Sequence, residues 1–268
     1  MPPAPQTPPP SWTRSILRRL IHTAPARWTL GAIVSLTQYR VFAPRTVQAM
    51  RFDLLRLSAR MRQPRTLESP SSPKLHLGCG KRSVPGWLNV DVASGDRVVD
   101  LASGSLPWPD ASFQAIVSQH VIEHLVLEDE LLPLLRELNR VSKPGAEIWL
   151  SCPDLEAICR LYCQDRGEGL IEDRLRRPHG DLGLDGLPKQ HIVNAIFYQD
   201  GEHKNLLDFE MLEWLLRTTG FESCVRVREA DLLARFPEFP RRNDDYHTVY
   251  AKARKPESPG EKLAGLPA

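Results

Sequence analysis

The feature that most constrains this chain is a series of short apolar segments between residues 74 and 154, which alternate with turns and helical stretches. Strands are predicted at residues 74–77, 87–92, 96–101, 115–118 and 147–152, and a helix at 131–141 ends at Lys143-Pro144-Gly145. Short apolar strands alternating with helices favour a parallel sheet that is covered on both faces. The predicted fold class is therefore α/β, with a doubly wound, mostly parallel sheet.

The remaining residues predict an insertion and a second group of elements. Helices are predicted at 155–162 and 206–219, a long polar connection at 167–204, and a strand pair at 221–227 and 248–253. A connection this long in a compact domain is usually functional, so we interpret residues 155–205 as a lid-like insertion. The predicted division is an N-terminal extension at 1–73, a domain at 74–255 and a disordered tail at 256–268.

The N-terminal extension differs from the rest of the chain in charge. Residues 1–70 hold eleven arginines and two acidic residues, a net charge of +9, so a total of +2 leaves −7 for the remainder. Residues 2–10 predict a polyproline-like tail, followed by helices at 12–21 and 45–61. The second helix has an apolar stripe of Val47, Met50, Leu54, Leu57 and Met61. Packing on a protein, peripheral binding to an anionic membrane and contact with nucleic acid all remain open, nucleic acid being the least favoured.

Cysteine usage and the start of the chain bear on the compartment. The five cysteines suggest no disulfide framework, which favours a reducing compartment. The spacing of Cys152, Cys159 and Cys163 fits neither zinc nor iron–sulfur patterns. The first ten residues are uncharged and proline-rich, unlike a signal peptide, and no apolar stretch is long enough for a membrane span. We expect a cytoplasmic protein, and peripheral membrane contact through the extension stays one of the open alternatives.

Glycines and carboxylates follow three successive predicted strands. Gly78 and Gly80 follow the first, where glycine permits a tight turn and close approach of a ligand. Asp91 ends the second strand, where a carboxylate can accept hydrogen bonds from both hydroxyls of a ribose. Asp100 ends the third, where it can accept one from an adenine amino group. The order of these features predicts a nucleoside site at the carboxyl edge of the sheet.

The same segments resemble a known family. Leu75-His76-Leu77-Gly78-Cys79-Gly80, Pro85-Gly86-Trp87-Leu88-Asn89-Val90-Asp91 and Leu106-Pro107-Trp108-Pro109-Asp110 are similar to class I S-adenosylmethionine-dependent methyltransferases, most closely the type 11 group. Val121-Ile122-Glu123-His124-Leu125 and Lys143-Pro144-Gly145 continue the resemblance in the expected order. It is strong over residues 74–154, weaker over 203–253, and absent from 1–70.

The resemblance implies a cofactor, its contacts and a terminal antiparallel hairpin in a Rossmann-like sheet. The cofactor is S-adenosylmethionine. Backbone at Gly78, Cys79 and Gly80 would border its amino acid part, and Asp91 would bind the ribose. The adenine would be held by the Asp100 carboxylate and the Leu101 amide, while Ser118, Gln119 and His120 would face the cofactor and the reaction centre.

Several positions depart from the family pattern. The usual acid before Leu-Gly is His76, the third glycine is replaced near Lys81-Arg82, and the aspartate after Ser-Phe is Gln114. The short interval from Gly80 to Asp91 predicts a short first helix.

The implied reaction is methyl transfer to an oxygen or nitrogen of a small molecule or glycan. Such transfer depends mainly on in-line positioning, and a hydroxyl acceptor benefits from a general base. The candidates are His120, His124 and His203, of which His120 is preferred because it lies nearest a strand end. His179, His191 and His203 show no spacing typical of a metal site, so no metal is expected.

Two other function classes remain open. An NAD-type oxidoreductase would use a similar sheet, although the lost third glycine and the short interval before Asp91 count against it. A non-catalytic nucleotide-binding protein would keep the sheet without turnover, and His76 and Gln114 favour this alternative.

Overall fold

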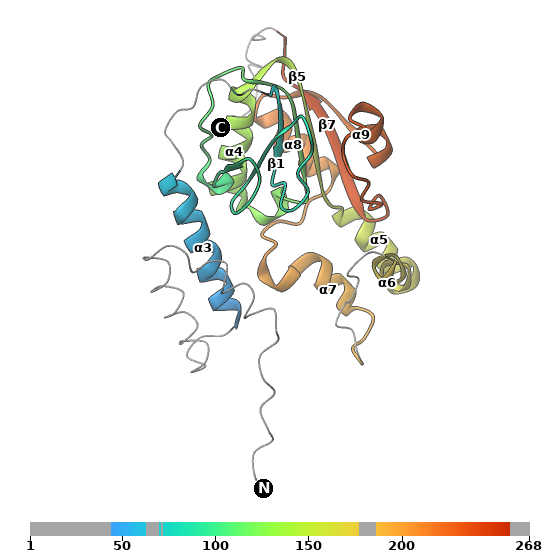
Figure 1. Ribbon diagram of the computed structural model, residues 1–268. Coiled ribbons are helices and arrows are strands. Elements are labelled where there is room, and N and C mark those ends of the chain that lie inside the picture. Colours follow the sequence, from blue (N-terminus) through green and yellow to red (C-terminus); the bar gives the residue numbers. More distant parts are fainter. Residues whose placement is uncertain (1–43, 63–69, 71, 177–185, 258–268) are drawn as a thin grey trace, which may run out of the picture. The chain divides into compact units, whose positions relative to one another are not determined.

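The structure is a computed structural model that describes residues 44–62, 70, 72–176 and 186–257 (Figure 1). The chain divides into two compact units, residues 1–54 and 55–268. The helix predicted at 45–61 is confirmed as α3 (Pro44–Arg62), which begins in the first unit and continues into the second. The predictions for residues 1–43 and for the end of the tail lie outside the described residues. The domain boundary at residue 73 remains a prediction.

A seven-stranded sheet forms the centre of the second unit, in the order β3-β2-β1-β4-β5-β7-β6. The pairs from β3 to β5 are parallel, and β7 is antiparallel to both β5 and β6. The predicted α/β class, with a doubly wound sheet and an antiparallel terminal hairpin, is confirmed. The strands are β1 (Lys74–Leu77), β2 (Leu88–Asp91), β3 (Arg97–Val98), β4 (Phe113–Gln119), β5 (Ser142–Pro153), β6 (Glu222–Val227) and β7 (Thr248–Arg254).

Successive residues of the central strands point to opposite faces of the sheet, and each face packs into a hydrophobic core of its own. Leu75, Ile116 and Ile148 pack on one face with the buried leucines of α4 (Leu132–Val141) and α8 (Phe209–Thr218). Val117 and Trp149 pack on the other face with residues from α9 (Glu229–Arg235) and the segment after it. Helices therefore cover both faces, and the strand ends are left to form a site.

The helices of the second unit follow the predicted apolar patterns. In α4, four buried residues lie on one face, and α8 begins where the Asp208 side chain accepts a hydrogen bond from the Met211 amide. Besides α4, α8 and α9, the helices that follow β5 are α5 (Leu155–Asp165), α6 (Glu168–Leu175) and α7 (His191–Tyr198). Four short helical segments are η1 (Leu101–Ser103), η2 (Ile122–His124), η3 (Leu127–Leu131) and η4 (Gln199–Gly201).

The segment between β5 and α8 has a small core of its own. Ile158, Leu170, Ile192 and Ile196 from α5, α6 and α7 pack together. The expectation of an irregular connection at 167–204 is therefore wrong where the structure describes it, because apolar residues at helical spacing found partners in α5. The two ends of this segment lie side by side. Asp154 forms an isolated β-bridge with Leu207, and the Leu155 amide donates a hydrogen bond to the Leu207 carbonyl at 2.9 Å.

Other predictions need correction. The third strand is shorter than expected, because Asp100 caps η1 and turns the chain away after β3. The short first helix is absent, since described residues 78–87 form turns. Helix α9 was not predicted, because its few apolar residues resemble part of a loop.

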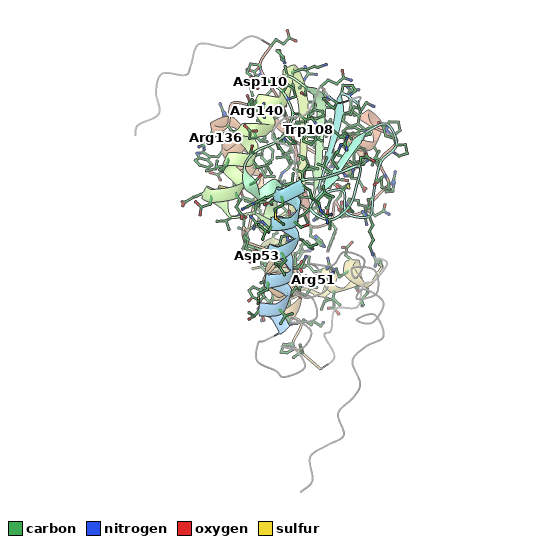
Figure 2. The ribbon with its side chains drawn as sticks, turned by 60° about the vertical axis from the view of Figure 1, so that its left-hand side comes forward. Arg51, Asp53, Trp108, Asp110, Arg136 and Arg140 are labelled. Atoms are coloured by element: carbon green, nitrogen blue, oxygen red, sulfur yellow. The ribbon has the colours of Figure 1, made fainter. Side chains whose placement is uncertain are left out.

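The Leu106–Asp110 motif has a structural role at the amino edge of the sheet. Arg140 of α4 donates to the Trp108 carbonyl at 2.9 Å and to Asp110 Oδ1 at 2.8 Å, so all three lie together near the end of α4 (Figure 2). Within residues 44–62, 70, 72–176 and 186–257, no helix combines the length and apolar character that crossing a bilayer requires.

Candidate functional site

The glycine turn after β1 has one closed side and one open side. Gly78 has a φ of +62°, and a Cβ there would overlap Cγ2 of Val121, which follows β4. Gly80 has a φ of +53°, but a Cβ there would meet nothing within 4 Å. Both positions favour glycine for their backbone angles. Gly78 is also needed for close packing, whereas Gly80 leaves open space where a ligand can approach the backbone.

Asp91 lies beside this turn, as predicted. Its Oδ2 accepts a hydrogen bond from the Gly80 amide at 3.1 Å, and its Oδ1 accepts one from Ala93 at 3.0 Å. The Cys79 amide donates to the Val90 carbonyl at 3.1 Å, which extends the pairing of β1 and β2 into the turn. Each oxygen of Asp91 retains a lone pair, so the half-buried carboxylate can accept further hydrogen bonds from a polyol.

Asp100 ends the next strand, and its carboxylate is already engaged. The side chain is buried and caps η1, which begins at Leu101, by accepting from the Ala102 amide at 3.2 Å. Arg56 Nε donates to Oδ1 at 3.2 Å and Arg60 Nε donates to Oδ2 at 2.5 Å. An adenine amino group would therefore have to share Asp100 with two guanidinium groups. The sequence did not predict these contacts of Asp100 with Arg56 and Arg60.

Ser118 and Gln119 lie at the predicted strand end, on β4. Both side chains are buried, and Gln119 Nε2 donates a long hydrogen bond of 3.5 Å to the Tyr250 hydroxyl of β7. The Gln119 side chain thus turns toward the neighbouring strand. The predicted cofactor contacts of these two residues remain a prediction.

His120 is held between two carboxylates. Its Nε2 lies 2.9 Å from Asp244 Oδ2 and its Nδ1 lies 3.3 Å from Glu123 Oε1. Burial alone would lower the pKa of His120, but the interactions with Asp244 and Glu123 outweigh burial and raise it. The backbone φ of +56° is unusual for histidine. Both ring nitrogens are engaged and the protonated form is favoured, so the imidazole is poorly suited to accept a proton.

Asp244 is the hub of this network, and sequence reasoning missed it. Its carboxylate accepts hydrogen bonds from the Tyr250 hydroxyl at 2.6 Å and from Arg242 Nε at 2.9 Å, besides facing His120. Burial would raise its pKa, but these partners lower it. Asp244 lies far from His120 along the chain, and no local spacing connects them; the polar run at 241–247 was the only signal.

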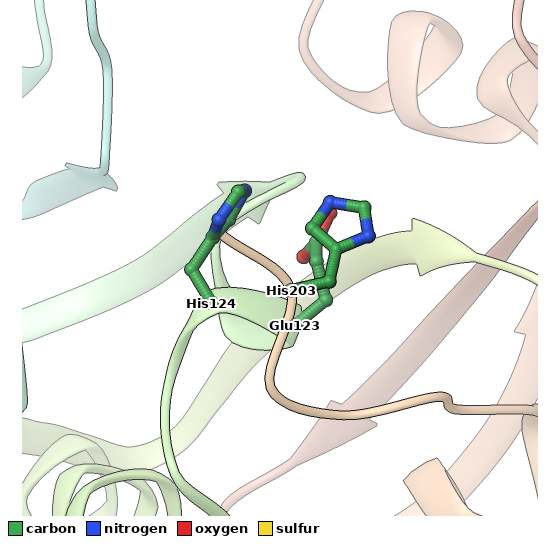
Figure 3. Close-up of side chains that lie close together, drawn as sticks. All are labelled: Glu123, His124 and His203. Atoms are coloured by element: carbon green, nitrogen blue, oxygen red, sulfur yellow. The ribbon is translucent and has the colours of Figure 1, made fainter. Parts of the chain in front are cut away.

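A second group joins His124 to His203, which the sequence proposed separately. The Glu123 carbonyl accepts hydrogen bonds from the amides of Lys204 and Asn205 at 2.7 and 3.1 Å, which fixes the segment before α8 against η2. The ring centroids of His124 and His203 lie 4.8 Å apart in an edge-to-face arrangement. Figure 3 shows both rings beside the Glu123 carboxylate. Burial lowers the pKa of His203, so its neutral form is favoured.

The departures from the family pattern have structural explanations. His76 is buried, with Nδ1 3.1 Å from Asn89 Oδ1 and its ring 4.9 Å from that of Phe239. It therefore supports the core instead of the strand tip. Gln114 lies at the opposite, amino edge of the sheet, where it lines a cavity with Lys74 and Glu147. That cavity is remote from the strand tips and takes no part in the candidate site.

Sequence comparison gives one family match. Residues 75–150 match the family described as "Methyltransferase domain". A search of curated proteins gives no match.

Solved structures give weak likenesses. An S-adenosylmethionine-dependent methyltransferase from Thermotoga maritima, described as a possible histamine N-methyltransferase, is 17% identical with a TM-score of 0.42, over 78% of this chain and 95% of its own. A methyltransferase from Archaeoglobus fulgidus is 16% identical with a TM-score of 0.40, over 76% and 94% of the chains. Phosphoethanolamine N-methyltransferase 2 of Haemonchus contortus is 13% identical with a TM-score of 0.39, over 75% and 52%.

TM-scores this low do not establish a common fold, so the assignment rests on the family match and on the sheet itself. The matched residues run from β1 through most of β5 and include the carboxyl ends of β1, β2, β3 and β4. Residues 75–150 are thus similar to a methyltransferase domain, and the strand order of the sheet agrees with the predicted class I methyltransferase.

Proposed function

We propose that the protein is an S-adenosylmethionine-dependent methyltransferase that acts on an oxygen or nitrogen of a small molecule or glycan. The family match supports methyl transfer and the cofactor. The observation that carries the cofactor site is the hydrogen bond from the Gly80 amide to Asp91, which joins the tips of β1 and β2. It brings an open glycine backbone and a carboxylate together where ligands of open α/β sheets bind.

The residues at these tips fit the cofactor's chemistry. The open side of Gly80 admits a ligand to the backbone, and Asp91 offers acceptors for a ribose diol. Asp100 offers an acceptor for the adenine amino group once the side chains of Arg56 and Arg60 move off its carboxylate. In this proposal Leu101 contributes its backbone amide, and Ser118 and Gln119 border the reaction centre.

The bound cofactor would supply an electrophilic methyl group, which leaves the protein with the task of placing the acceptor in line with it. We assign the acceptor side to His124 and His203, because these half-buried rings lie together beyond β4. The neutral His203 can accept a proton from the acceptor, and nearby Glu123 stabilises the resulting imidazolium. His120 acts as a positioning residue that orients Glu123 through their 3.3 Å contact.

The rival oxidoreductase assignment has less support. A dinucleotide pyrophosphate is usually held at the N-terminus of a helix that follows the first strand. Described residues 78–87 contain no helix, so that anion site is missing from this part of the chain. Tighter binding of NADH than of S-adenosylhomocysteine would favour the rival.

Calorimetric titration with S-adenosylhomocysteine tests the proposal. The wild type should bind, and Asp91→Asn should bind at least about tenfold more weakly, because an amide cannot accept two hydroxyl donors as a carboxylate does. The matched control is Glu222→Gln, which neutralises an exposed acid on edge strand β6. Equal affinity in wild type and Asp91→Asn would contradict the assignment. Absence of methyl transfer to any screened acceptor would favour a non-catalytic binding protein.

The proposal includes peripheral contact of a cytoplasmic protein with an anionic membrane. Leu57 and Met61 of α3 are exposed apolar residues in an arginine-rich segment. Full-length protein should float with anionic vesicles, and high salt or deletion of residues 1–70 should abolish flotation. Equal flotation of the shortened chain would contradict this part of the proposal.

A further inference from the structure

Glu123, His124 and His203 form a cluster whose composition suggests more than proton transfer. Each can offer one ligand atom, and these atoms all lie within 4.8 Å of one another. Glu123 and His124 come from η2, and His203 comes from the segment before α8, so the group joins two parts of the chain (Figure 3). Two imidazoles and one carboxylate are a common ligand set for catalytic zinc.

The Glu123 carboxylate provides a second, independent observation. The residue is only 2% exposed, and apart from the contact of Oε1 with His120, neither carboxylate oxygen accepts a hydrogen bond from the residues that the structure describes. The closest cationic group is His120, whose Nδ1 lies 3.3 Å from Oε1. Burying a carboxylate with so few partners is unfavourable. A bound cation would supply the missing interactions.

We propose that Glu123, His124 and His203 bind a divalent transition-metal cation, with Zn²⁺ as the best-matched ion. Three protein ligands leave a coordination position open, as in catalytic zinc sites. That position suits the oxygen of an acceptor hydroxyl, whose proton the ion would make easier to release to solvent. This role of the ion rests on the proposed methyltransferase function, whereas metal binding itself does not.

The backbone holds the ligands near their places before an ion binds. The paired hydrogen bonds from Lys204 and Asn205 to the Glu123 carbonyl fix His203 opposite η2. A tetrahedral zinc site needs ligand atoms about 3.3–3.5 Å apart. Small rotations of the two half-buried rings would provide this contraction.

Metal binding and proton acceptance are alternative states of the same side chains. His203 can therefore serve as a proton acceptor only while no ion is bound to it. Sequence reasoning expected no metal, because the ligands lie in segments far apart in the chain and have no local spacing.

Calorimetric titration of Zn²⁺ into the full-length, chelator-treated protein tests the inference. One ion should bind per chain, and His124→Asn and His203→Asn should each weaken binding at least about tenfold, since even loss of an outer-shell partner can cost that much. The control is His191→Asn, which removes a histidine of α7 outside the cluster and should leave zinc affinity unchanged. Thermal melting checks that each variant folds.

Co²⁺ provides a second readout that does not depend on activity. The wild-type Co²⁺ protein should show the visible absorption of a low-coordinate nitrogen and oxygen site, and Glu123→Gln should weaken or shift it. Failure of the wild type to bind Zn²⁺ would overturn the inference. So would a Zn²⁺ affinity in His124→Asn and in His203→Asn that equals that of the wild type.

Binding of S-adenosylhomocysteine to the chelator-treated protein separates the two proposals. If it binds while Zn²⁺ does not, the metal inference is overturned and the methyltransferase proposal stands. If Zn²⁺ binds with the expected ligand dependence while S-adenosylhomocysteine does not, the metal site is supported and the proposed function fails.

Discussion

Replacing each glycine of the β1 turn by alanine should separate stability from ligand binding. At Gly78, the φ of +62° and the overlap with Val121 both oppose a Cβ. The backbone conformation costs about 1–2 kcal/mol, and overpacking costs typically about 1–3 kcal/mol. At Gly80, the φ of +53° brings a similar backbone cost, but the surrounding space is open.

We therefore expect Gly78→Ala to lose about 2–5 kcal/mol of unfolding free energy and Gly80→Ala about 1–2 kcal/mol. In a domain of this size, these losses correspond to falls in Tm of roughly 4–20 °C and 2–8 °C. Gly80→Ala should be the more damaging for S-adenosylhomocysteine affinity, because its methyl group enters the space assigned to the ligand.

Thermal unfolding and calorimetric titration of the two variants measure these effects. Val121→Ala provides the control, because removing the γ-methyl groups should recover the overpacking part of the Gly78→Ala loss but none of the Gly80→Ala loss. Equal destabilisation at the two glycines would refute the packing argument. Unchanged affinity in a folded Gly80→Ala variant would refute the ligand assignment.

Two further predictions concern the carboxylates. Arg60→Ala should strengthen S-adenosylhomocysteine binding by no more than about fivefold. The variant frees Asp100 from a half-exposed ion pair, which is worth up to about 1 kcal/mol. Weaker binding would instead mean that Arg60 contacts the ligand. The stabilisation that comes from the raised pKa of His120 is complete below its ordinary value near 6.5, and it is lost as pH rises through the higher folded value. The difference in Tm between wild type and Asp244→Asn should therefore narrow from pH 6 to pH 9, and a constant difference would argue against a charged His120.

The sequence was most informative where contacts are local. The alternation of apolar strands and helices predicted the sheet, and the motif order predicted that Asp91 would lie beside Gly80, because successive parallel strands end at one edge. The cluster of His124 with His203 was not predicted as a unit. It depends on hydrogen bonds from Lys204 and Asn205 to Glu123, between segments with no shared periodicity.

Long-range charge pairing was the other gap. The engagement of Asp100 by Arg56 and Arg60 links a helix of the arginine-rich segment to a strand tip, and composition gave no indication of this particular pair. The network around His120 likewise depends on Asp244, which lies beyond α9. Charged side chains carry no periodic signal, so such pairs emerge only from the folded structure.

The pairing of Asp154 with Leu207 has a practical consequence. The chain leaves the sheet for α5, α6 and α7 and comes back to the point of departure, so the two junctions are neighbours in space. A foreign segment of different length could be grafted between these junctions without altering any strand register. Exchange of this cassette among related proteins offers a route by which one catalytic scaffold could acquire new acceptors.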